Sequence, residues 1–197
     1  MKKQNHPVLG SILSVEPIRN PKDILTIKKR LDNPRDFAIF VVGINTAFRA
    51  SDLLNITVGQ VRHLGPGDTL PVREKKTRKE RRVTLNKSAH DAIRKLLVTF
   101  PEATPDDAWL FQSRKKKGKL LVSTLNTMVQ EWCSWCNLPG RQGSHSLRKT
   151  FGYQHRVQFG TDLPTLMTVF GHSTQQQTLH YLCIQAEDVK EAFMREI

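Results

Sequence analysis

The chain has 197 residues, of which 38% are hydrophobic, a content that suits one folded domain and excludes a disordered tail. Lys and Arg outnumber Asp and Glu by 31 to 18, which gives a net charge of +13 and a pI of about 10.0. This excess favours a polyanionic partner, most often nucleic acid, although a generally basic surface or an anionic membrane surface would give the same balance.

Neither the N-terminus nor the apolar runs indicate a membrane segment. The first ten residues, MKKQNHPVLG, are basic, but no apolar segment of a signal peptide follows them. The longest apolar run, from Phe37 to Ile44, is too short to span a bilayer. We therefore expect a cytoplasmic protein that makes no membrane contact.

Two predicted helices open the chain with the same pair of residues. In NPKDILTIKKRL, Asn20 caps the helix and Pro21 takes its first position. The same Asn-Pro start recurs at Asn33 and Pro34, in NPRDFAIFVVGINTA. The apolar content of this stretch predicts a buried helix. A turn at 47–49 and a short helix, SDLLNI, are expected next.

The middle of the chain changes to the period of strands. The stretches 56–64, 68–74 and 81–85 (ITVGQVRHL, DTLPVRE and RRVTL) predict three short strands, with a cationic hairpin tip, KKTRKE, between the last two. Helical spacing returns at 87–100, and further helices are expected at 123–138, 145–159, 163–170, 174–182 and 187–197. The sequence therefore predicts an α+β fold that is mainly helical, with one small three-stranded antiparallel sheet.

The three cysteines give no clear metal or redox pattern. Cys133 and Cys136 form a C-x-x-C in EWCSWC, and Cys183 stands far from them. A zinc site needs two further ligands at close spacing, and none follows the pair. We interpret the pair as core cysteines of a helix, with metal or redox chemistry as the alternative.

Six polar residues stand out against this apolar scaffold. The first follows the predicted buried helix, and the second lies on the hairpin tip. The next two lie one helical turn apart in GSHSLRKTFGYQHR, and the last two belong to VFGHSTQQQTLHYL. In chain order they are Arg49, Lys76, His145, Arg148, His172 and Tyr181.

Each of the six also has an ordinary structural explanation. Arg49 could simply pair with Asp52, and Lys76 could be a solvated cation. The H-x-x-R pair could be a solvated helix face, His172 a helix-start residue and Tyr181 a half-buried core residue. Only their occurrence together raises a functional interpretation.

Together, the six residues have the chemistry of a phosphoryl-transfer site. Two arginines can hold the non-bridging oxygens of a phosphodiester, and histidines add hydrogen bonds as charge develops at phosphorus. A tyrosine hydroxyl can act as nucleophile, and a lysine on a hairpin can protonate the leaving oxygen. The set contains no clustered carboxylates, so it does not suit a two-metal nuclease.

The order of these residues resembles the catalytic domain of the tyrosine recombinases, also called phage integrases. The family pattern is Arg, Lys, His-x-x-Arg, His, Tyr. It is matched here by FRASDLLNI, KTRKERRVTL, SHSLRKTF and FGHSTQQQTLHYL. The resemblance runs from about residue 35 to the C-terminus. It implies six catalytic residues, which are Arg49, Lys76, His145, Arg148, His172 and Tyr181.

Three positions depart from the family pattern. Ala47 stands where members often have glycine, and Asp52 replaces the usual glutamate that orients the first arginine. Cys183 stands two residues after the tyrosine, where histidine is frequent. None of these changes removes a catalytic group, although the shorter carboxylate of Asp52 alters its reach.

The resemblance also sets expectations for the domain organisation. Only about 48 residues precede Arg49, too few for the N-terminal helical domain with which typical members clamp DNA. We expect a single catalytic domain over 1–197, with an extension at 1–20, a core at 21–182 and a tail helix at 183–197. In this it resembles the short members, such as the fimbrial phase-variation invertases, although a fragment of a longer protein would look alike.

The function that the resemblance implies is site-specific DNA recombination through a 3′-phosphotyrosine intermediate, without metal, ATP or other cofactor. DNA relaxation of the type IB topoisomerase kind and a non-catalytic DNA-binding accessory role are the alternatives. The expected partner is double-stranded DNA, bound by a monomer in solution and a tetramer on synapsed sites, with tail contacts between protomers. Basic residues expected to contact DNA are Lys75, Arg78, Lys79, Arg114, Lys115, Lys116 and Lys117.

Overall fold

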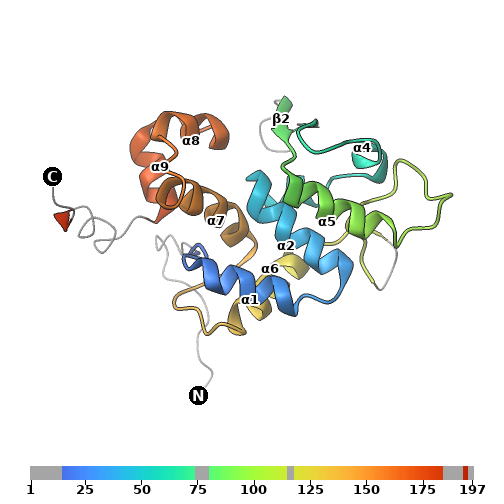
Figure 1. The fold of residues 1–197 in the computed structure, drawn as a ribbon, viewed down its shortest axis with the longest axis horizontal. Helices are drawn as coiled ribbons and strands as arrows, with labels where there is room; N and C mark the ends of the chain where they lie inside the picture. The colour runs from blue at the N-terminus through green and yellow to red at the C-terminus, as the bar shows by residue number, and fades with distance from the viewer. Residues whose placement is uncertain (1–14, 74–79, 115–117, 184–192, 195–197) are drawn as a thin grey trace, which may run out of the picture.

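The computed structural model describes residues 15–73, 80–114, 118–183 and 193–194, and it is mainly helical with a small sheet at one edge (Figure 1). The α+β fold predicted from the sequence is thus confirmed, while the tail helix predicted at 187–197 falls outside the described residues except for 193 and 194. The helices are α1 (Pro21–Arg30), α2 (Pro34–Thr46), α3 (Ala50–Leu53), α4 (Val58–Val61), α5 (Lys87–Leu97), α6 (Val122–Ser134), α7 (Ser144–Val157), α8 (Leu163–Phe170) and α9 (Gln175–Leu182).

Helices α1 and α2 begin where the Asn-Pro pairs predict. The side chain of Asn20 accepts a hydrogen bond from the backbone N–H of Lys22 at 2.9 Å. Asn33 does the same for the N–H of Asp36 at 3.2 Å. The proline that follows each asparagine has no N–H to satisfy, so it costs nothing in the first turn. These local contacts fix both helix starts.

Within the described residues, the sheet has two strands rather than the three predicted. Strands β1 (Thr69–Arg73) and β2 (Glu80–Thr84) pair antiparallel, with Thr69 opposite Thr84 and Arg73 opposite Glu80. The residues between these strands, 74–79, lie outside the described part of the chain. The register nevertheless fixes where this hairpin tip leaves the sheet and returns to it.

The strand predicted at 56–64 is the short helix α4 instead. The backbone N–H of Thr57 donates to Oε1 of Gln60 at 2.9 Å, which is one half of a helix-capping box. Val58 and Val61 then lie one turn apart and are both buried. The spacing of the apolar residues resembles that of a strand, but the T-x-x-Q capping box stabilises a helical turn instead.

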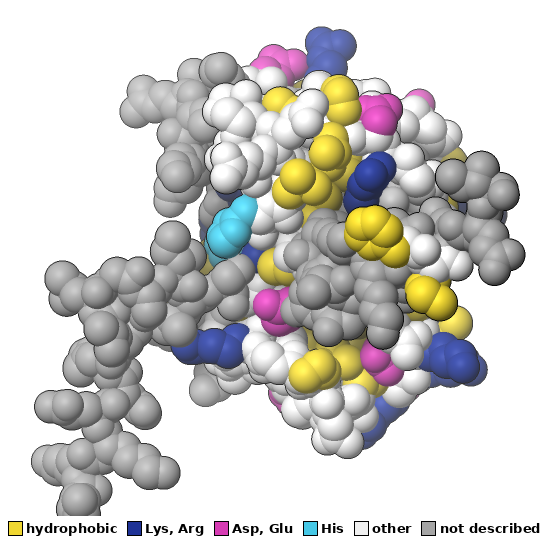
Figure 2. Space-filling view, turned by 90° about the vertical axis from the view of Figure 1, so that its left-hand side faces the viewer, with side chains coloured by type: hydrophobic (Ala, Val, Ile, Leu, Met, Phe, Trp, Pro, Cys, Tyr) yellow, Lys and Arg dark blue, Asp and Glu magenta, His cyan; other side chains and the backbone are white. Residues whose placement is uncertain are grey.

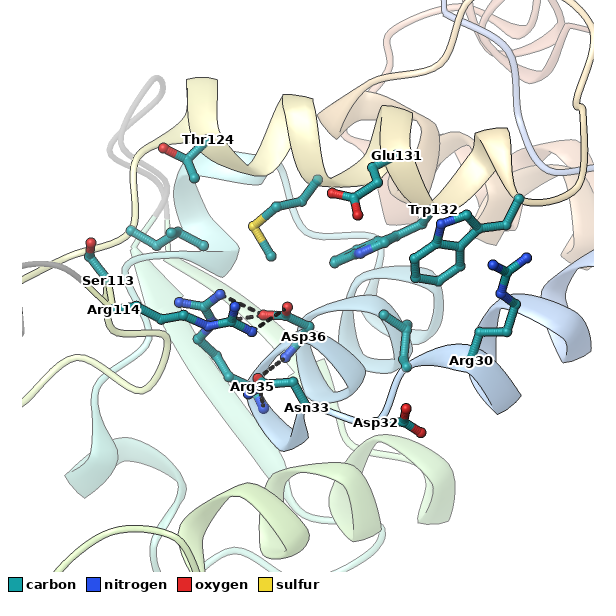
Figure 3. Close-up of a pocket in the computed structure, with 14 residues that line it drawn as sticks. Arg30, Asp32, Asn33, Arg35, Asp36, Ser113, Arg114, Thr124, Glu131 and Trp132 are labelled. Atoms are coloured by element: carbon teal, nitrogen blue, oxygen red, sulfur yellow. Dashed lines mark hydrogen bonds and ion pairs between the residues drawn. The ribbon is translucent and has the colours of Figure 1, made fainter.

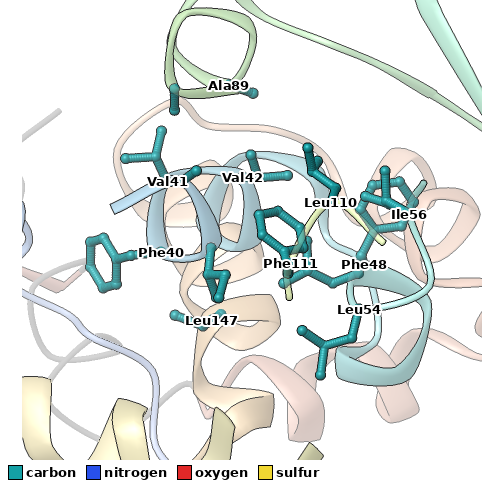
Figure 4. Packing of buried hydrophobic residues seen from close by; sticks show 14 of the residues in the cluster. Phe40, Val41, Val42, Phe48, Leu54, Ile56, Ala89, Leu110, Phe111 and Leu147 are labelled. Atoms are coloured by element: carbon teal, nitrogen blue, oxygen red, sulfur yellow. The ribbon is translucent and has the colours of Figure 1, made fainter. Parts of the chain in front are cut away.

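Helix α2 forms the centre of the main hydrophobic core. Helices α5 and α7 pack against it, and Ile39, Phe40 and Val42 have no exposed surface. Figure 4 shows Phe40, Val41 and Val42 among side chains from other segments, including Leu147 of α7. A helix covered on several sides needs apolar residues around its whole circumference. This explains the nearly continuous apolar run and confirms the buried helix predicted there.

A second, smaller hydrophobic cluster joins α7, α8 and α9. Its buried members are Ala47, Leu166, Phe170 and Leu182, with the ring of Tyr181 packed against them. Helices α8 and α9 contact each other, and α9 contacts α7. The C-terminal helices therefore have a local core of their own.

Gly152 of α7 allows this close approach. A Cβ atom at this position would lie 2.6 Å from both Cδ2 of Leu182 and Cζ of Phe170, closer than packed atoms tolerate. Helix α7 thus presents bare backbone to the side chains of α8 and α9, which fill the space that a larger residue would take.

We expect Gly152→Ala to lower the free energy of unfolding by about 1–3 kcal/mol, because the added methyl overpacks this contact. Thermal unfolding would measure the loss, with Gln176→Ala, at an exposed position of α9, as the matched control. A melting temperature at or above that of the wild type would show that the cluster accommodates the methyl group.

Cys133 and Cys136 behave as the core cysteines predicted from the sequence. Cys133 is buried in the main core, and Cys136 packs against the same core from the segment after α6. Both are free thiols, and burial raises the pKa of Cys133 to about 12. Cys133 is therefore protonated at neutral pH, a poor state for a metal ligand or nucleophile.

No helix within the described residues is both long and apolar enough to cross a membrane.

Candidate active site

Arg148 is held at the C-terminal ends of two helices. Its Nη1 donates to the carbonyl of Ala47, which ends α2, and its Nη2 donates to the carbonyl of Phe170 at 3.0 Å, at the end of α8. The side chain is 3% exposed, and its guanidinium lies 4.9 Å from the centre of the Phe170 ring. Helix C-terminal carbonyls carry partial negative charge and therefore stabilise this buried cation.

Ala47 makes this arrangement possible through its backbone. It has a left-handed conformation, with φ 53° and ψ 27°, at the end of α2. This turns the chain so that Arg49 can begin α3 a few residues later. Glycine adopts this conformation without penalty, which gives a physical reason for the glycine that family members often have here.

Arg49 and Asp52 form an ion pair at the start of α3. Nη1 of Arg49 lies 3.8 Å from Oδ2 of Asp52, whose side chain is 3% exposed. The hydroxyl of Ser51 also lies 3.3 Å from Oδ1 of the same carboxylate. Asp52 therefore orients Arg49 despite being one carbon shorter than the usual glutamate. This contact fits the ordinary ion-pair explanation as well as the functional one.

The start of α7 places His145 and Arg148 one turn apart, as predicted. The helix enters through Gly143, where a Cβ atom would lie 2.3 Å from Oδ1 of Asn126. That oxygen instead accepts a hydrogen bond from the N–H of Ser144 at 3.1 Å. The glycine at the helix entrance is thus required by close packing against α6.

His145 reaches the surface beside three cations. Desolvation, followed by the charges of Arg148, Lys149 and Arg49, lowers its pKa. A neutral imidazole at pH 7 is able to accept a proton.

His172 follows the left-handed Gly171 that ends α8. Its backbone N–H donates to the carbonyl of Met167 at 2.9 Å, and its Nδ1 contacts Oγ1 of Thr178 at 3.1 Å. The ring stacks against Phe170 with 5.3 Å between ring centres. Desolvation and the charges of Arg148 and Arg49 lower its pKa.

Tyr181 lies on α9, and the centre of its ring is 5.1 Å from that of Phe170 and 5.2 Å from that of His172, so the three rings form a compact cluster. Its hydroxyl oxygen is buried and lies near the Arg148 side chain. Burial raises the pKa of Tyr181, while Arg148 and Arg49 lower it in part. The hydroxyl is thus enclosed but electrostatically close to both arginines.

The structure therefore brings five of the six predicted residues into one neighbourhood. Arg148 and Arg49 influence the ionisation of His145, His172 and Tyr181 alike. The sixth residue, Lys76, falls on the hairpin between β1 and β2 and outside the described residues. The same holds for six of the predicted DNA contacts, which are Lys75, Arg78, Lys79, Lys115, Lys116 and Lys117.

Arg114, the remaining predicted DNA contact, lies at the other end of α2. Its Nη2 contacts Oδ2 of Asp36 at 3.0 Å, while Arg35 holds the other oxygen of this carboxylate at 2.6 Å. The three side chains line one wall of a cavity of about 560 Å³ (Figure 3). Asp36 and Ala47 are eleven positions apart on α2, or about 16 Å along its axis. Arg114 is therefore remote from the five gathered residues.

Two further cations at this site were missed by the sequence analysis. Arg81 of β2 donates from Nη1 to the carbonyl of Ala47 at 3.2 Å, the same oxygen that Arg148 binds. Lys149 is buried beside Tyr181. Strand alternation could have placed Arg81 on the inner face with Val83, whereas no local pattern marks Lys149.

The described residues hold no group of three or more His, Cys, Asp or Glu side chains placed to bind a metal ion. A mainly helical domain that gathers two arginines, two histidines and a tyrosine in this chain order is the arrangement expected of a tyrosine-type recombinase.

Comparison with known proteins agrees with this class. The model of the phage integrase family matches residues 20–188. The "Probable integrase/recombinase YoeC" of Bacillus subtilis (strain 168) is 30% identical over 181 residues, which cover 91% of this chain and 95% of that protein. The "Tyrosine recombinase XerC" of Caldanaerobacter subterraneus is 30% identical over 167 residues, 82% of this chain but 46% of that protein. The chain belongs to the phage integrase family.

Solved structures show the same fold. The XerH site-specific recombinase, in a post-cleavage complex with its palindromic difH substrate, superimposes with a TM-score of 0.73 at 18% sequence identity. The match covers 91% of this chain and 51% of XerH. The chain thus spans about half the length of XerH and of the XerC relative.

Proposed function

We propose that this member of the family, a site-specific DNA recombinase, cleaves DNA with Tyr181 as the nucleophile. The observation that carries the proposal is the buried Tyr181 hydroxyl, which is electrostatically coupled to two arginines that are themselves held by the fold. The oxygen of Tyr181 would attack phosphorus and form a 3′-phosphotyrosyl bond. The bond to the 5′ oxygen breaks, and this oxygen leaves as a hydroxyl.

The arginines would stabilise the pentavalent transition state. A guanidinium carries five N–H groups, and Arg148 donates two of them to the carbonyls of Ala47 and Phe170. These contacts fix the plane of the guanidinium before DNA arrives. Arg49, oriented by Asp52, would supply the second positive charge. Preorganised donors of this kind lower a barrier because they need no rearrangement during the reaction.

The histidines would act in their neutral forms. The lowered pKa of His145 leaves its imidazole able to accept the proton of Tyr181 at neutral pH. His172 is fixed through Nδ1 by Thr178, so Nε2 is the nitrogen that can meet a phosphate oxygen. The sequence motif alone assigns Lys76 as the general acid that protonates the leaving 5′ oxygen.

Strand exchange would follow when a 5′-hydroxyl of a partner duplex attacks the phosphotyrosyl bond. Each broken phosphodiester is stored as another phosphodiester, so the exchange needs no ATP. The experiment that tests the proposal is incubation with duplex DNA carrying the flanking repeats of the chain's own gene, followed by denaturing gel analysis. A covalent protein–DNA adduct and recombinant product are expected. Adduct and relaxation without recombinant product would indicate a topoisomerase instead.

We expect cleavage to survive excess EDTA, because Arg49 and Arg148 supply the positive charge that a divalent ion would otherwise bring. Adduct yield with and without chelator, measured at constant ionic strength, is the readout. Complete loss in EDTA that magnesium restores, with DNA affinity unchanged, would contradict the assigned chemistry.

The assembly is also part of the proposal. Residues 1–20, 21–182 and 183–197 would act as extension, catalytic core and tail, in a cytoplasmic protein that is a monomer alone and a tetramer on synapsed DNA. Phe193 and Met194 of the tail are each at least 73% exposed, which supports apolar contacts between protomers through the tail. Figure 2, from the side that lies to the left in Figure 1, shows hydrophobic side chains gathered on one face.

A further inference from the structure

Lys149 is a buried lysine that directly follows Arg148 on α7. Its side chain is 5% exposed, so its ammonium group has lost most of its contact with water. Such burial is unfavourable unless other groups compensate the charge. Nζ lies 3.1 Å from Sγ of Cys183 and 5.1 Å from the centre of the Tyr181 ring. The ammonium therefore lies over the face of the proposed nucleophile.

Cys183 is the residue at which α9 ends, two positions after Tyr181. It has a left-handed conformation with φ 55°, which residues other than glycine and asparagine seldom adopt. Its carbonyl accepts a hydrogen bond from Nη2 of Arg19 at 2.6 Å, and its thiol lies 3.8 Å from the carbonyl of Val15. The end of the nucleophile helix is thus held from one side by α7 and from the other by the N-terminal segment.

We propose that Lys149 and Cys183 form a positioning pair that orients Tyr181 and favours its ionised form. This inference rests on the proposed role of Tyr181 as nucleophile. The sulfur of Cys183 fixes the ammonium of Lys149, and the ammonium in turn lies against the aromatic ring that must become a phenolate. Because Lys149 is buried, it acts through Tyr181 rather than by touching DNA.

In this proposal the charge of Lys149 adds to the charges of Arg148 and Arg49 around Tyr181. Arg148 comes from the same helix, Arg49 from the start of α3 and His172 from the segment after α8, while Cys183 belongs to the end of α9 itself. Burial and Cys183 oppose ionisation of the tyrosine, whereas Arg148 and Arg49 favour it. Removing the ammonium should therefore make the phenolate harder to form and leave the remaining phosphate contacts in place.

The test is the pH dependence of single-turnover cleavage by Lys149→Met, measured as covalent adduct on a nicked suicide substrate. We expect a roughly thirtyfold lower rate at neutral pH, the size of a desolvated cation–π contact. We also expect the rising limb of the pH profile to move to higher pH, and DNA affinity to stay at the wild-type value. Lys95→Met is the matched control, since Nζ of Lys95 lies 5.0 Å from the centre of the Phe37 ring, in a different part of the fold.

Two variants of Cys183 keep the test informative if Lys149→Met does not fold. Cys183→Ala removes the sulfur that holds the ammonium and should shift the profile in the same direction by a smaller amount. Cys183→Ser retains an acceptor and should lie closer to the wild type than Cys183→Ala does. Melting temperatures are measured for all variants, and rates are compared well below the lowest of them.

The outcomes separate this inference from the proposed function. Adduct formation by Tyr181→Phe would reject the nucleophile itself. If the adduct depends on Tyr181 but Lys149→Met keeps the wild-type profile, the positioning pair is rejected while the function stands. A rate reduced equally at every pH also rejects it, because a purely structural role would produce that result.

Discussion

Tyr181→Phe is expected to abolish covalent adduct formation, by more than about a thousandfold, as loss of a catalytic nucleophile usually does. The substitution removes one oxygen and leaves the ring in contact with Phe170 and His172. Because Arg148 keeps its hydrogen bonds to the carbonyls of Ala47 and Phe170, loss of the buried hydroxyl should not destabilise the fold. Denaturing gels with labelled DNA measure the adduct, and thermal unfolding measures the stability.

The matched control is Tyr153→Phe, which removes the same atom from the other tyrosine of the chain, on α7. This variant should still form the adduct. DNA affinity of both variants should equal that of the wild type, since neither change touches a cation. An adduct of undiminished yield in Tyr181→Phe would place the nucleophile elsewhere in the chain.

Arg148→Lys is expected to lower the single-turnover cleavage rate by about a hundredfold to a thousandfold, the effect of losing a preorganised transition-state donor. An ammonium keeps the positive charge but cannot donate in two directions within one plane. It can therefore not bind the carbonyls of Ala47 and Phe170 and still present a flat face to a phosphate. Rates on a suicide substrate would measure the effect.

Arg156→Lys is the matched control for this second prediction. Arg156 lies on the same helix and also donates to a backbone carbonyl, that of Thr161 at 3.3 Å, but it contributes nothing to the proposed site. It should cleave DNA at close to the wild-type rate. If Arg148→Lys did the same at a temperature where both variants are folded, charge alone would suffice and the bidentate role would be wrong.

Most of the fold could be predicted because its signals are local. The Asn-Pro pairs at 20–21 and 33–34 set two helix starts through contacts within three residues. The prediction was wrong where two local signals compete. In 56–64 the apolar spacing suggests a strand, but the Thr57–Gln60 cap stabilises a turn of helix. In this segment the capping hydrogen bonds, rather than the apolar periodicity, determine the secondary structure.

The site could be predicted only as far as the motif order reaches. His145 and Arg148 are fixed by helical spacing, and His172 and Tyr181 by the segment that joins α8 to α9. Lys149 could not be recognised, because the group that its ammonium contacts, Cys183, lies 34 residues further along the chain. Contacts between distant segments leave no periodic pattern in a sequence. Residues of a motif can therefore be predicted from the sequence, whereas residues that only support the site cannot.

The separate hydrophobic cluster beneath α8 and α9 has a consequence for hydrogen exchange. Helix α2 is surrounded by the main core, so its amides should exchange only through global unfolding. Helices α8 and α9 are held by a cluster of four buried side chains. Their amides should therefore exchange through a local opening that needs less free energy than global unfolding. The amides of the molecule then fall into two groups that differ in protection from hydrogen exchange, and Tyr181 belongs to the less protected group. Such an opening would expose the buried hydroxyl of Tyr181, while Arg49, which follows α2, would stay in place.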